Sequence, residues 1–354
     1  MKILFATNLA HIPQRVGGSV FTTHELALQF TAAGHKVGVV CSLSSGDTVW
    51  VKNRLISKLF RRKCPADQIF PYRVFRGYNV SEGLIEVLRN FKPDLMIAQA
   101  WHPIPLTMVS LQEGVRTLLY LHDVEFSTLG GDIPKDENLR IVANSNFTAN
   151  AFQRLSGLLP PVVPPLVRRH AYFTPTSRQR VVFVNTVPVK GLEVAIALAR
   201  LNPDIPFDFL EGWPLSAEQI VALEKRLLEI PNVRFHRNML DMRKAYANAK
   251  IVLIPSQLEE AWGRVATEAQ YSGIPCLASR IGGLPEAVGP GGYLIDPRAN
   301  IEEWDKHLKK LWFDHDIYDT MSKAAFSYST RDQLNPSRVI EEIRRISFDP
   351  PENR

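Results

Sequence analysis

The chain has 354 residues, with 42 Lys and Arg against 36 Asp and Glu, which gives a formal net charge of +6. The length indicates two domains, and 45% hydrophobic and 22% charged residues are ordinary globular values. They exclude extended disorder, a collagen-like repeat and a coiled coil. The cysteines Cys41, Cys64 and Cys276 are odd in number and far apart, which excludes a disulfide scaffold.

Targeting signals are not evident in the sequence. There is no run of eighteen apolar residues that would predict a transmembrane helix, and the apolar run at the N-terminus is too short for a signal peptide. The three separate cysteines suit a reducing compartment. We therefore expect a cytoplasmic protein.

The first part of the chain alternates short apolar runs with helical patterns. The apolar runs are continuous, as in strands covered on both faces, and lie at 2–7, 36–42, 94–99, 117–121 and 140–144. A glycine pair and a helical pattern that ends at Gly34 separate the first two runs. Strand, helix and strand in this order form a βαβ unit, so a parallel sheet is predicted over 1–160.

A proline-rich stretch without helical period, 161–178, is interpreted as an interdomain linker. Alternation then resumes over 179–330. Predicted strands lie at 181–184, 206–210, 232–235, 250–255, 274–278 and 292–295. Predicted helices lie at 191–201, 216–229, 241–249, 262–272, 284–288, 301–329 and 335–347. The fold class is therefore α/β, with two parallel-sheet domains in tandem and a C-terminal segment, 331–354.

Ligands of parallel sheets bind beyond the carboxyl ends of the strands, and the stretch after the strand 250–255 is rich in polar groups there. Glu260 and Glu268 are separated by about 12 Å of helix rise, whereas paired glycosidase carboxylates are about 5 Å apart. They would therefore hold different parts of one long polar ligand. The helix start at Gly263 with Arg264 would attract phosphate, although a solvated helix start is an equal alternative.

Other candidate residues follow strands elsewhere. Lys190 opens a helix, where its charge opposes the helix dipole unless a diphosphate is bound. Gly17 and Gly18 let backbone approach a ligand closely, and His122 could hydrogen-bond a sugar hydroxyl. A solvated lysine, a plain turn and a satisfied core histidine are the structural alternatives. The D-x-D pattern at 314–316 lies inside a predicted helix and is interpreted as a solvated face or helix cap.

Residues 51–63 carry six basic residues and no acidic residue, with apolar residues between them. This pattern fits an amphipathic helix at an anionic membrane surface, and it equally fits a solvated helix or a contact with an anionic acceptor. The chain offers no aromatic stacking platform, so nucleic acid is not expected as a partner.

Together these motifs resemble the retaining family 4 glycosyltransferases of the GT-B fold, also called group 1 glycosyl transferases. The specific stretch is PSQLEEAWGRVATEAQYSGIPCLASRIGGLPEAVG, which contains the family's E-x₇-E spacing. Supporting stretches are GGSVFTTHELALQFTAAGHKVGVV, VANSNFTANAF and VPVKG. The resemblance spans nearly the whole chain and implies two Rossmann-like domains that face an interdomain cleft. It implies that 1–160 is the acceptor side, that 179–330 binds the nucleotide-sugar donor, and that a C-terminal helix within 331–354 packs back on the first domain.

The resemblance implies a metal-independent, retaining transfer of a sugar from a nucleotide diphosphate sugar, with UDP or GDP, to an acceptor hydroxyl (EC 2.4). It implies that Glu260 contacts the donor sugar, that Glu268 accepts from the ribose, that Lys190 balances the diphosphate and that His122 lies beside the donor sugar. Further donor-binding positions are Gly17, Gly18, Asn185, Thr186, Gly263, Arg264 and Val265. It implies no cofactor, and it leaves open a glycan, a lipid-linked molecule or a small molecule as acceptor.

The chain departs from the family pattern where an arginine usually precedes the lysine, because Asn185 and Thr186 occupy that region. Arg264 could replace the missing charge. Two alternatives stay open at this stage: a nucleotide-sugar epimerase of the same fold, and a non-catalytic nucleotide-sugar binding protein.

Overall fold

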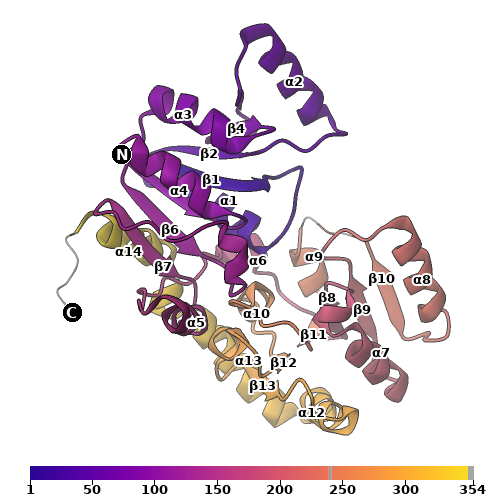
Figure 1. Cartoon of the computed structure of the whole chain (residues 1–354). Helices are drawn as coiled ribbons and strands as arrows, with labels where there is room; N and C mark the ends of the chain where they lie inside the picture. The colour runs from indigo at the N-terminus through magenta and orange to yellow at the C-terminus, as the bar shows by residue number, and fades with distance from the viewer. Residues whose placement is uncertain (238, 240, 350–354) are drawn as a thin grey trace. The chain divides into compact units, whose positions relative to one another are not determined.

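The computed structural model of the chain describes residues 1–237, 239 and 241–349 (Figure 1). It divides into two compact units. Unit 1 comprises Met1–Leu166 and the chain from Asn335 on, and unit 2 comprises Val167–Leu334. The first division lies within the predicted linker 161–178, and the second lies where the C-terminal helix begins.

Unit 1 is built on a seven-stranded sheet in the order β3-β4-β2-β1-β5-β6-β7. All neighbours are parallel except β3 and β4. The strands are β1 (Lys2–Ala10), β2 (Lys36–Ser42), β3 (Ala66–Asp67), β4 (Arg73–Gly77), β5 (Leu95–Gln99), β6 (Thr117–Leu121) and β7 (Leu139–Ala143). Strands β3 and β4 were not predicted, because β3 has only two residues and arginines interrupt the apolar run of β4.

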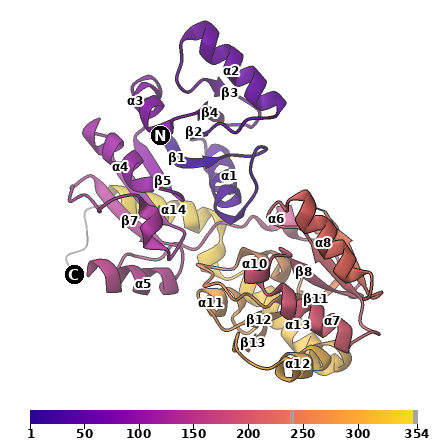
Figure 2. The ribbon, with the colours of Figure 1, turned by 45° about the vertical axis from the view of Figure 1, so that its right-hand side comes forward.

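Alternate strand residues of unit 1 face two separate cores, which explains the continuous apolar runs. One core joins Ile3 and Phe5 to α1 (Gly18–Ala32) and to Val339 and Ile343 of α14 (Pro336–Phe348). Figure 2 shows α14 in the same part of the molecule as the unit 1 strands. The other core joins Leu4 to the remaining covering helices, α3 (Val80–Phe91), α4 (Pro103–Gln112) and α5 (Asn146–Ser156).

Unit 2 is built on a six-stranded, wholly parallel sheet in the order β10-β9-β8-β11-β12-β13. The strands are β8 (Arg180–Val184), β9 (Phe207–Leu210), β10 (Val233–His236), β11 (Ala249–Ile254), β12 (Cys276–Ser279) and β13 (Gly292–Ile295). In chain order within the unit this is 3-2-1-4-5-6, the arrangement of dinucleotide-binding folds.

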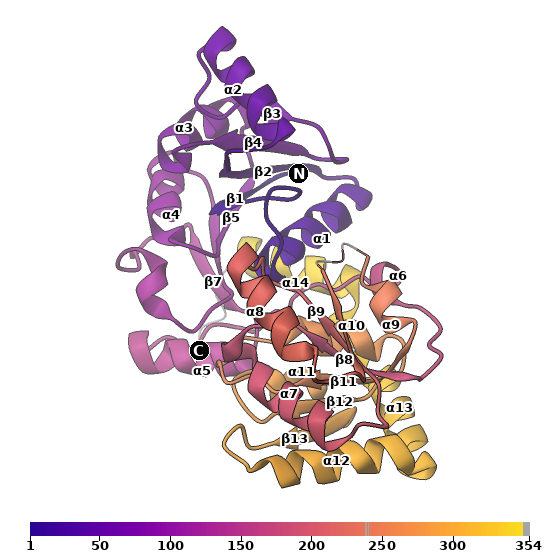
Figure 3. The same ribbon diagram turned by 90° about the vertical axis from the view of Figure 1, so that its right-hand side faces the viewer.

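The helices of unit 2 cover both faces of its sheet. They are α6 (Arg169–Tyr172), α7 (Leu192–Leu201), α8 (Ala217–Leu227), α9 (Arg243–Tyr246), α10 (Arg264–Gln270), α11 (Leu284–Val288), α12 (Ile301–Phe313) and α13 (His315–Ser329). The helices α7, α8 and α12 share one core, and α9 and α10 share another. Figure 3 shows α7 and α12 side by side. The predicted α/β class with two parallel sheets is confirmed.

Two predicted helices differ from the structure. The expected helix 301–329 is broken at Asp314, whose carboxylate accepts the backbone N–H of Ile317 at 3.0 Å and caps α13. This role confirms the helix-cap interpretation of the D-x-D pattern. The expected helix 241–249 contracts to the four residues of α9. None of the helices in the described ranges is long and apolar enough to cross a bilayer.

Candidate functional site

The strand order of unit 2 places a topological switch point between β8 and β11. The chain leaves β8 toward β9 and leaves β11 toward β12, on opposite sides, so the two connections diverge and leave a crevice at the strand ends. Residues 185–191 follow β8, and residues 255–263 follow β11. These two loops carry five of the predicted site residues: Asn185, Thr186, Lys190, Glu260 and Gly263.

An ion pair joins the two loops at the switch point. The ammonium of Lys190 lies 2.5 Å from Oε1 of Glu260, and the two side chains are only 12% and 19% exposed. The structure therefore brings together two residues that are seventy positions apart in the chain. The ion pair thereby fixes the two side chains, and the loops that carry them, at the switch point.

Trp213 was not singled out from the sequence, although it belongs to the same group. It lies in the loop after β9, and the Lys190 ammonium is 5.0 Å from the centroid of its indole ring. The side-chain oxygen of Asn185 accepts the backbone N–H of Trp213 at 3.0 Å, which fixes the loop. Trp213 as a whole is 42% exposed. An aromatic residue directly after a strand end was the signal that could have found it.

Close backbone packing sets the distance between the two loops. Gly191 has φ +85°, and a Cβ added there would lie 2.0 Å from the carbonyl oxygen of Pro255. The backbone N–H of Gln257 donates to the carbonyl of Val189 at 2.9 Å in the same region. Only glycine fits at position 191, so the Lys-Gly sequence is a structural requirement of the ion pair.

A second glycine contact holds the backbone of Glu260. The N–H of Gly283 donates to the Glu260 carbonyl at 2.6 Å. Gly282 has φ +59°, and a Cβ added there would lie 2.3 Å from that carbonyl oxygen. The Gly282–Gly283 pair thus packs against the Glu260 loop, which gives a physical reason for the two adjacent glycines in the stretch 255–289.

Glu268 lies in α10 within a buried polar cluster of unit 2. Its carboxylate accepts the hydroxyl of Tyr246 at 3.1 Å and lies 3.4 Å from Nε of Arg264. Burial, and then the nearby Glu268 charge, raise the pKa of Tyr246 well above its usual value, so Tyr246 stays a donor. Arg264 also donates to the Tyr172 hydroxyl at 3.0 Å. That Arg264 replaces the missing family arginine stays a prediction.

The remaining predicted residues of unit 2 lie beside these groups. Gly263 precedes α10 with φ +111°, and Val265 packs against the core that includes Tyr246. Thr186 is 3% exposed, and its hydroxyl oxygen has no hydrogen-bond partner among the described residues. Their roles toward a donor stay predictions.

The sheet of unit 1 has its own switch point, between β1 and β5. After β5, Ala100 and His102 have φ of +63° and +49°, a backbone conformation that such residues rarely adopt. Strained backbone of this kind is typical of functional sites. Gly17 and Gly18 stand at the start of α1, which follows β1.

His122 follows β6 and is linked to α1 through Gln99. Its Nε2 lies 2.9 Å from Oε1 of Gln99, whose amide nitrogen donates to the hydroxyl of Thr23. Because the amide oxygen of Gln99 can only accept, Nε2 of His122 is the donor, which defines the tautomer. His122 is half-buried rather than a core residue. Gln99 and Thr23 were missed in the sequence because neither type marks a strand end or a helix by itself.

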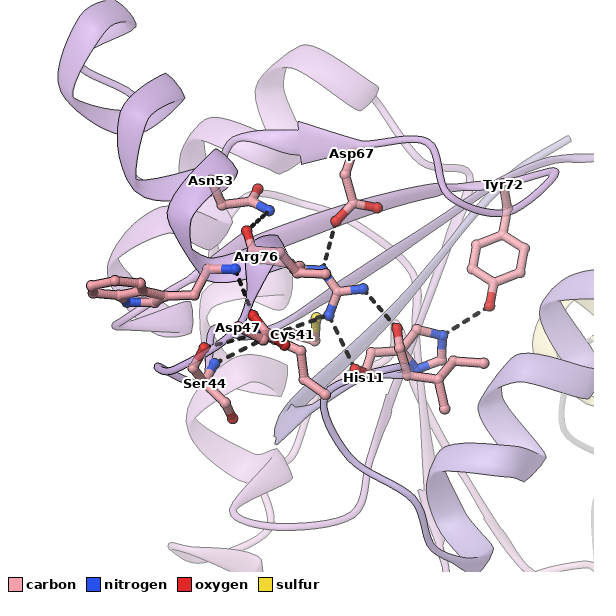
Figure 4. A network of polar contacts seen from close by, with 12 residues as sticks. His11, Cys41, Ser44, Asp47, Asn53, Asp67, Tyr72 and Arg76 are labelled. Carbon is pink, nitrogen blue, oxygen red and sulfur yellow. Dashed lines mark hydrogen bonds and ion pairs between the residues drawn. The ribbon is translucent and has the colours of Figure 1, made fainter. Parts of the chain in front are cut away.

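A buried arginine holds the loop that leads from β1 to Gly17 (Figure 4). Arg76 donates to the backbone carbonyls of His11 and Ile12 at 3.1 and 2.7 Å. Its Nε lies 2.6 Å from the carboxylate of Asp67, and both side chains are almost fully buried. The unpredicted strand β3 supplies Asp67, so this strand serves to neutralise Arg76.

His11 lies in the same network and is neutral at physiological pH. Its Nε2 is 2.8 Å from the hydroxyl of Tyr72, which also lies 2.6 Å from Nδ1 of His24. Burial, followed by the charges of Arg76 and His24, lowers the pKa of His11 to about 3.

Comparison with known families agrees with this architecture. Residues 16–169 match the family model described as Glycosyltransferase Family 4, and residues 169–328 match that of Glycosyl transferases group 1. The chain belongs to the family 4 glycosyltransferases. This confirms the resemblance that the motif at 255–289 indicated.

Curated relatives align with part of the chain. D-inositol 3-phosphate glycosyltransferase of Segniliparus rotundus is 32% identical over 167 residues, which cover 44% of this chain and 37% of the relative. The protein of that name from Corynebacterium urealyticum is 33% identical over 200 residues, which cover 52% of this chain and 47% of the relative. The chain thus spans less than half the length of these relatives.

Solved structures match the fold over nearly the whole chain. Anabaena HepE in complex with UDP and glucose has a TM-score of 0.75 at 18% identity and covers 97% of this chain and 98% of its own. Sucrose-phosphate synthase from Thermosynechococcus elongatus has a TM-score of 0.74 at 17% identity, with 98% of both chains covered. The GT-B fold is thereby confirmed.

Replacement of Arg76 by methionine should destabilise unit 1, because it leaves the Asp67 carboxylate buried without its partner. We expect the free energy of unfolding in urea to fall by about 3–5 kcal/mol. The matched control is Arg73→Met in the same strand, because Arg73 is exposed, and it should change stability by less than about 0.5 kcal/mol. Equal effects of the two variants would contradict the role of Arg76.

The stability of the protein should depend on pH through His11. Its pKa is lowered in the folded state, so only the unfolded chain takes up the proton as the pH falls below about 6.5. The contribution of neutral His11 to the free energy of unfolding is fully present above that pH. It is lost as the pH falls toward about 3, by up to about 1.4 kcal/mol per pH unit. Urea unfolding at several pH values should show a shallower slope for His11→Gln. The exposed His315→Gln should keep the original slope.

Proposed function

We propose that this chain transfers a sugar from a nucleotide diphosphate sugar to an acceptor hydroxyl, with retention of anomeric configuration and without a metal ion. The observation that carries the proposal is the Lys190–Glu260 ion pair at the switch point of unit 2. A cation and a carboxylate side by side match the two halves of such a donor, which are an anionic diphosphate and a hydroxyl-bearing sugar.

Donor binding on this proposal is an exchange of partners. The ammonium of Lys190 leaves Glu260 and pairs with the diphosphate, and the freed Glu260 carboxylate accepts hydrogen bonds from sugar hydroxyls. Both groups stay charged and satisfied, so the exchange leaves no uncompensated buried charge. Glu268, held by Tyr246 and Arg264, would accept from the ribose hydroxyls.

The chemical step is a same-face substitution at the anomeric carbon. The bond from that carbon to the leaving phosphate oxygen breaks, the acceptor oxygen forms its bond on the same face, and the acceptor proton passes to the leaving phosphate. Lys190 stabilises the negative charge that develops on the diphosphate. The proposal thus assigns to Lys190 the neutralisation that a divalent cation would otherwise supply.

The relatives and structural neighbours favour particular classes of donor and acceptor. The structural neighbour HepE is solved with UDP and glucose and with UDP-glucose, which favours a uridine diphosphate sugar. The relatives named D-inositol 3-phosphate glycosyltransferase favour a small phosphorylated polyol or a related glycan as acceptor. We propose that the reaction takes place in the cytoplasm.

The test is turnover of UDP-glucose in the presence of inositol phosphates and of glycan acceptors, with UDP release and the sugar product measured together. We expect UDP release that depends on acceptor. Glu260→Gln should lower kcat by roughly 100-fold, because the sugar loses the carboxylate that orients it and the reacting carbon is no longer held in position. Glu259→Gln is the matched control, because Glu259 is exposed, and it should leave kcat within about twofold.

The products also separate the proposal from its alternatives. Transfer releases UDP and gives a new glycoside, whereas an epimerase gives an isomeric UDP-sugar without an acceptor. A non-catalytic binding protein gives neither product. Either of the last two outcomes would overturn the proposed function.

A further inference from the structure

We infer that helix α2 (Thr48–Phe60) docks on the surface of an anionic lipid bilayer. The observation that carries this inference is an apolar stripe on the outside of a helix that is framed by cations. The inference does not depend on the proposed transfer reaction, since binding to lipid requires neither donor nor acceptor.

Four apolar residues of α2 are exposed, whereas Val49, Trp50 and Ile56 are half-buried. Val51, Leu55 and Leu59 are 49%, 55% and 75% exposed. They are spaced four residues apart, so they form one stripe that spans roughly 80° of the helix surface. Phe60, at the helix end, is 68% exposed as well. Apolar residues of a surface helix normally face the core, so this exposed stripe departs from the usual arrangement.

The opposite side of the helix is the one that contacts unit 1. Asn53 is the buried residue of α2, all of whose residues the structure describes. It lies roughly 160° around the helix from Leu55. The helix is anchored at its start as well, where the side-chain amide of Gln14 donates to the Asp47 carboxylate at 2.9 Å. The anchoring of α2 therefore fixes the apolar stripe on the outside.

Cations flank the apolar stripe on both sides. Lys52 lies on one side and Arg54 and Lys58 lie on the other, and Arg61, Arg62 and Lys63 follow the helix end. All six are exposed, and residues 48–63 contain no acidic residue. One of the six is partly neutralised, because the Lys63 ammonium lies 3.3 Å from the Glu82 carboxylate. The remaining positive charge has no acidic neighbour in its own segment.

An anionic bilayer fits this pattern better than a protein groove does. Lipid phosphates attract the cations on both flanks, and the interfacial region accepts the apolar stripe between them. A protein partner would need an apolar groove rimmed with acid on both sides, which is a more specific demand. The stripe is about three helical turns long, which is too short to span a bilayer. This length suits a helix that lies in the membrane–water interface.

The experiment is flotation of the full chain with vesicles of phosphatidylcholine, with and without phosphatidylglycerol. We expect binding only where phosphatidylglycerol is present, and weaker binding as salt is raised. The triple variant Lys52→Gln, Arg54→Gln, Lys58→Gln should bind roughly 100-fold more weakly, at about one kcal/mol per cation. The pair Leu55→Ser, Leu59→Ser should lose at least about tenfold while the charge is kept.

Matched controls lie in unit 2. Leu228→Ser removes a leucine that is 83% exposed. The triple variant Lys225→Gln, Lys244→Gln, Lys310→Gln removes the same charge from other exposed positions. Both controls should bind vesicles as the wild type does. The inference is overturned if the wild type fails to float with anionic vesicles, or if the α2 variants and the controls lose binding equally.

Discussion

The ion pair between Lys190 and Glu260 is the interaction on which the account of unit 2 depends. It is formed by loops that follow two adjacent parallel strands, and backbone contacts fix its geometry. Gly191 packs against the Pro255 carbonyl, and Gly282 and Gly283 pack against the loop of Glu260. These glycines therefore act on the ion pair indirectly, through the backbone of the loops that carry the two charges. A side chain at any of these positions would separate the loops and leave two partly buried charges unpaired, which is strongly destabilising.

Unit 1 also contains a buried cation paired with a carboxylate. Arg76 is fully buried and holds the carbonyls of the loop that leads to Gly17, and the short strand β3 places Asp67 against it. In both units, a cation paired with a carboxylate thus lies beside the backbone that follows a central strand. The two groups differ in exposure, since the Arg76 pair is sealed from solvent and the Lys190 pair is partly accessible. This difference suits a structural role in unit 1 and a ligand-exchanging role in unit 2.

Much of the fold could be predicted because strands covered on both faces have continuous apolar runs, as in Val181–Val184. Lys190 and Glu260 could be proposed because they follow strand ends. Their direct contact could not be predicted, because it depends on which strands are neighbours in the sheet. Trp213, Gln99 and Thr23 were missed because their roles come from partners distant in the chain. The break at Asp314 was missed because helical periodicity continues through it, and β3 was missed because two residues carry no pattern.

The central claim is that the charges at the unit 2 switch point hold a nucleotide diphosphate. Calorimetric titration with UDP of the wild type, Lys190→Met and Glu268→Gln tests it most directly. The account predicts that the wild type binds UDP, that Lys190→Met loses roughly tenfold or more in affinity, as expected for a lost charge-assisted contact, and that Glu268→Gln weakens binding through the ribose. Unchanged UDP affinity in Lys190→Met, in a protein that still folds, would contradict it.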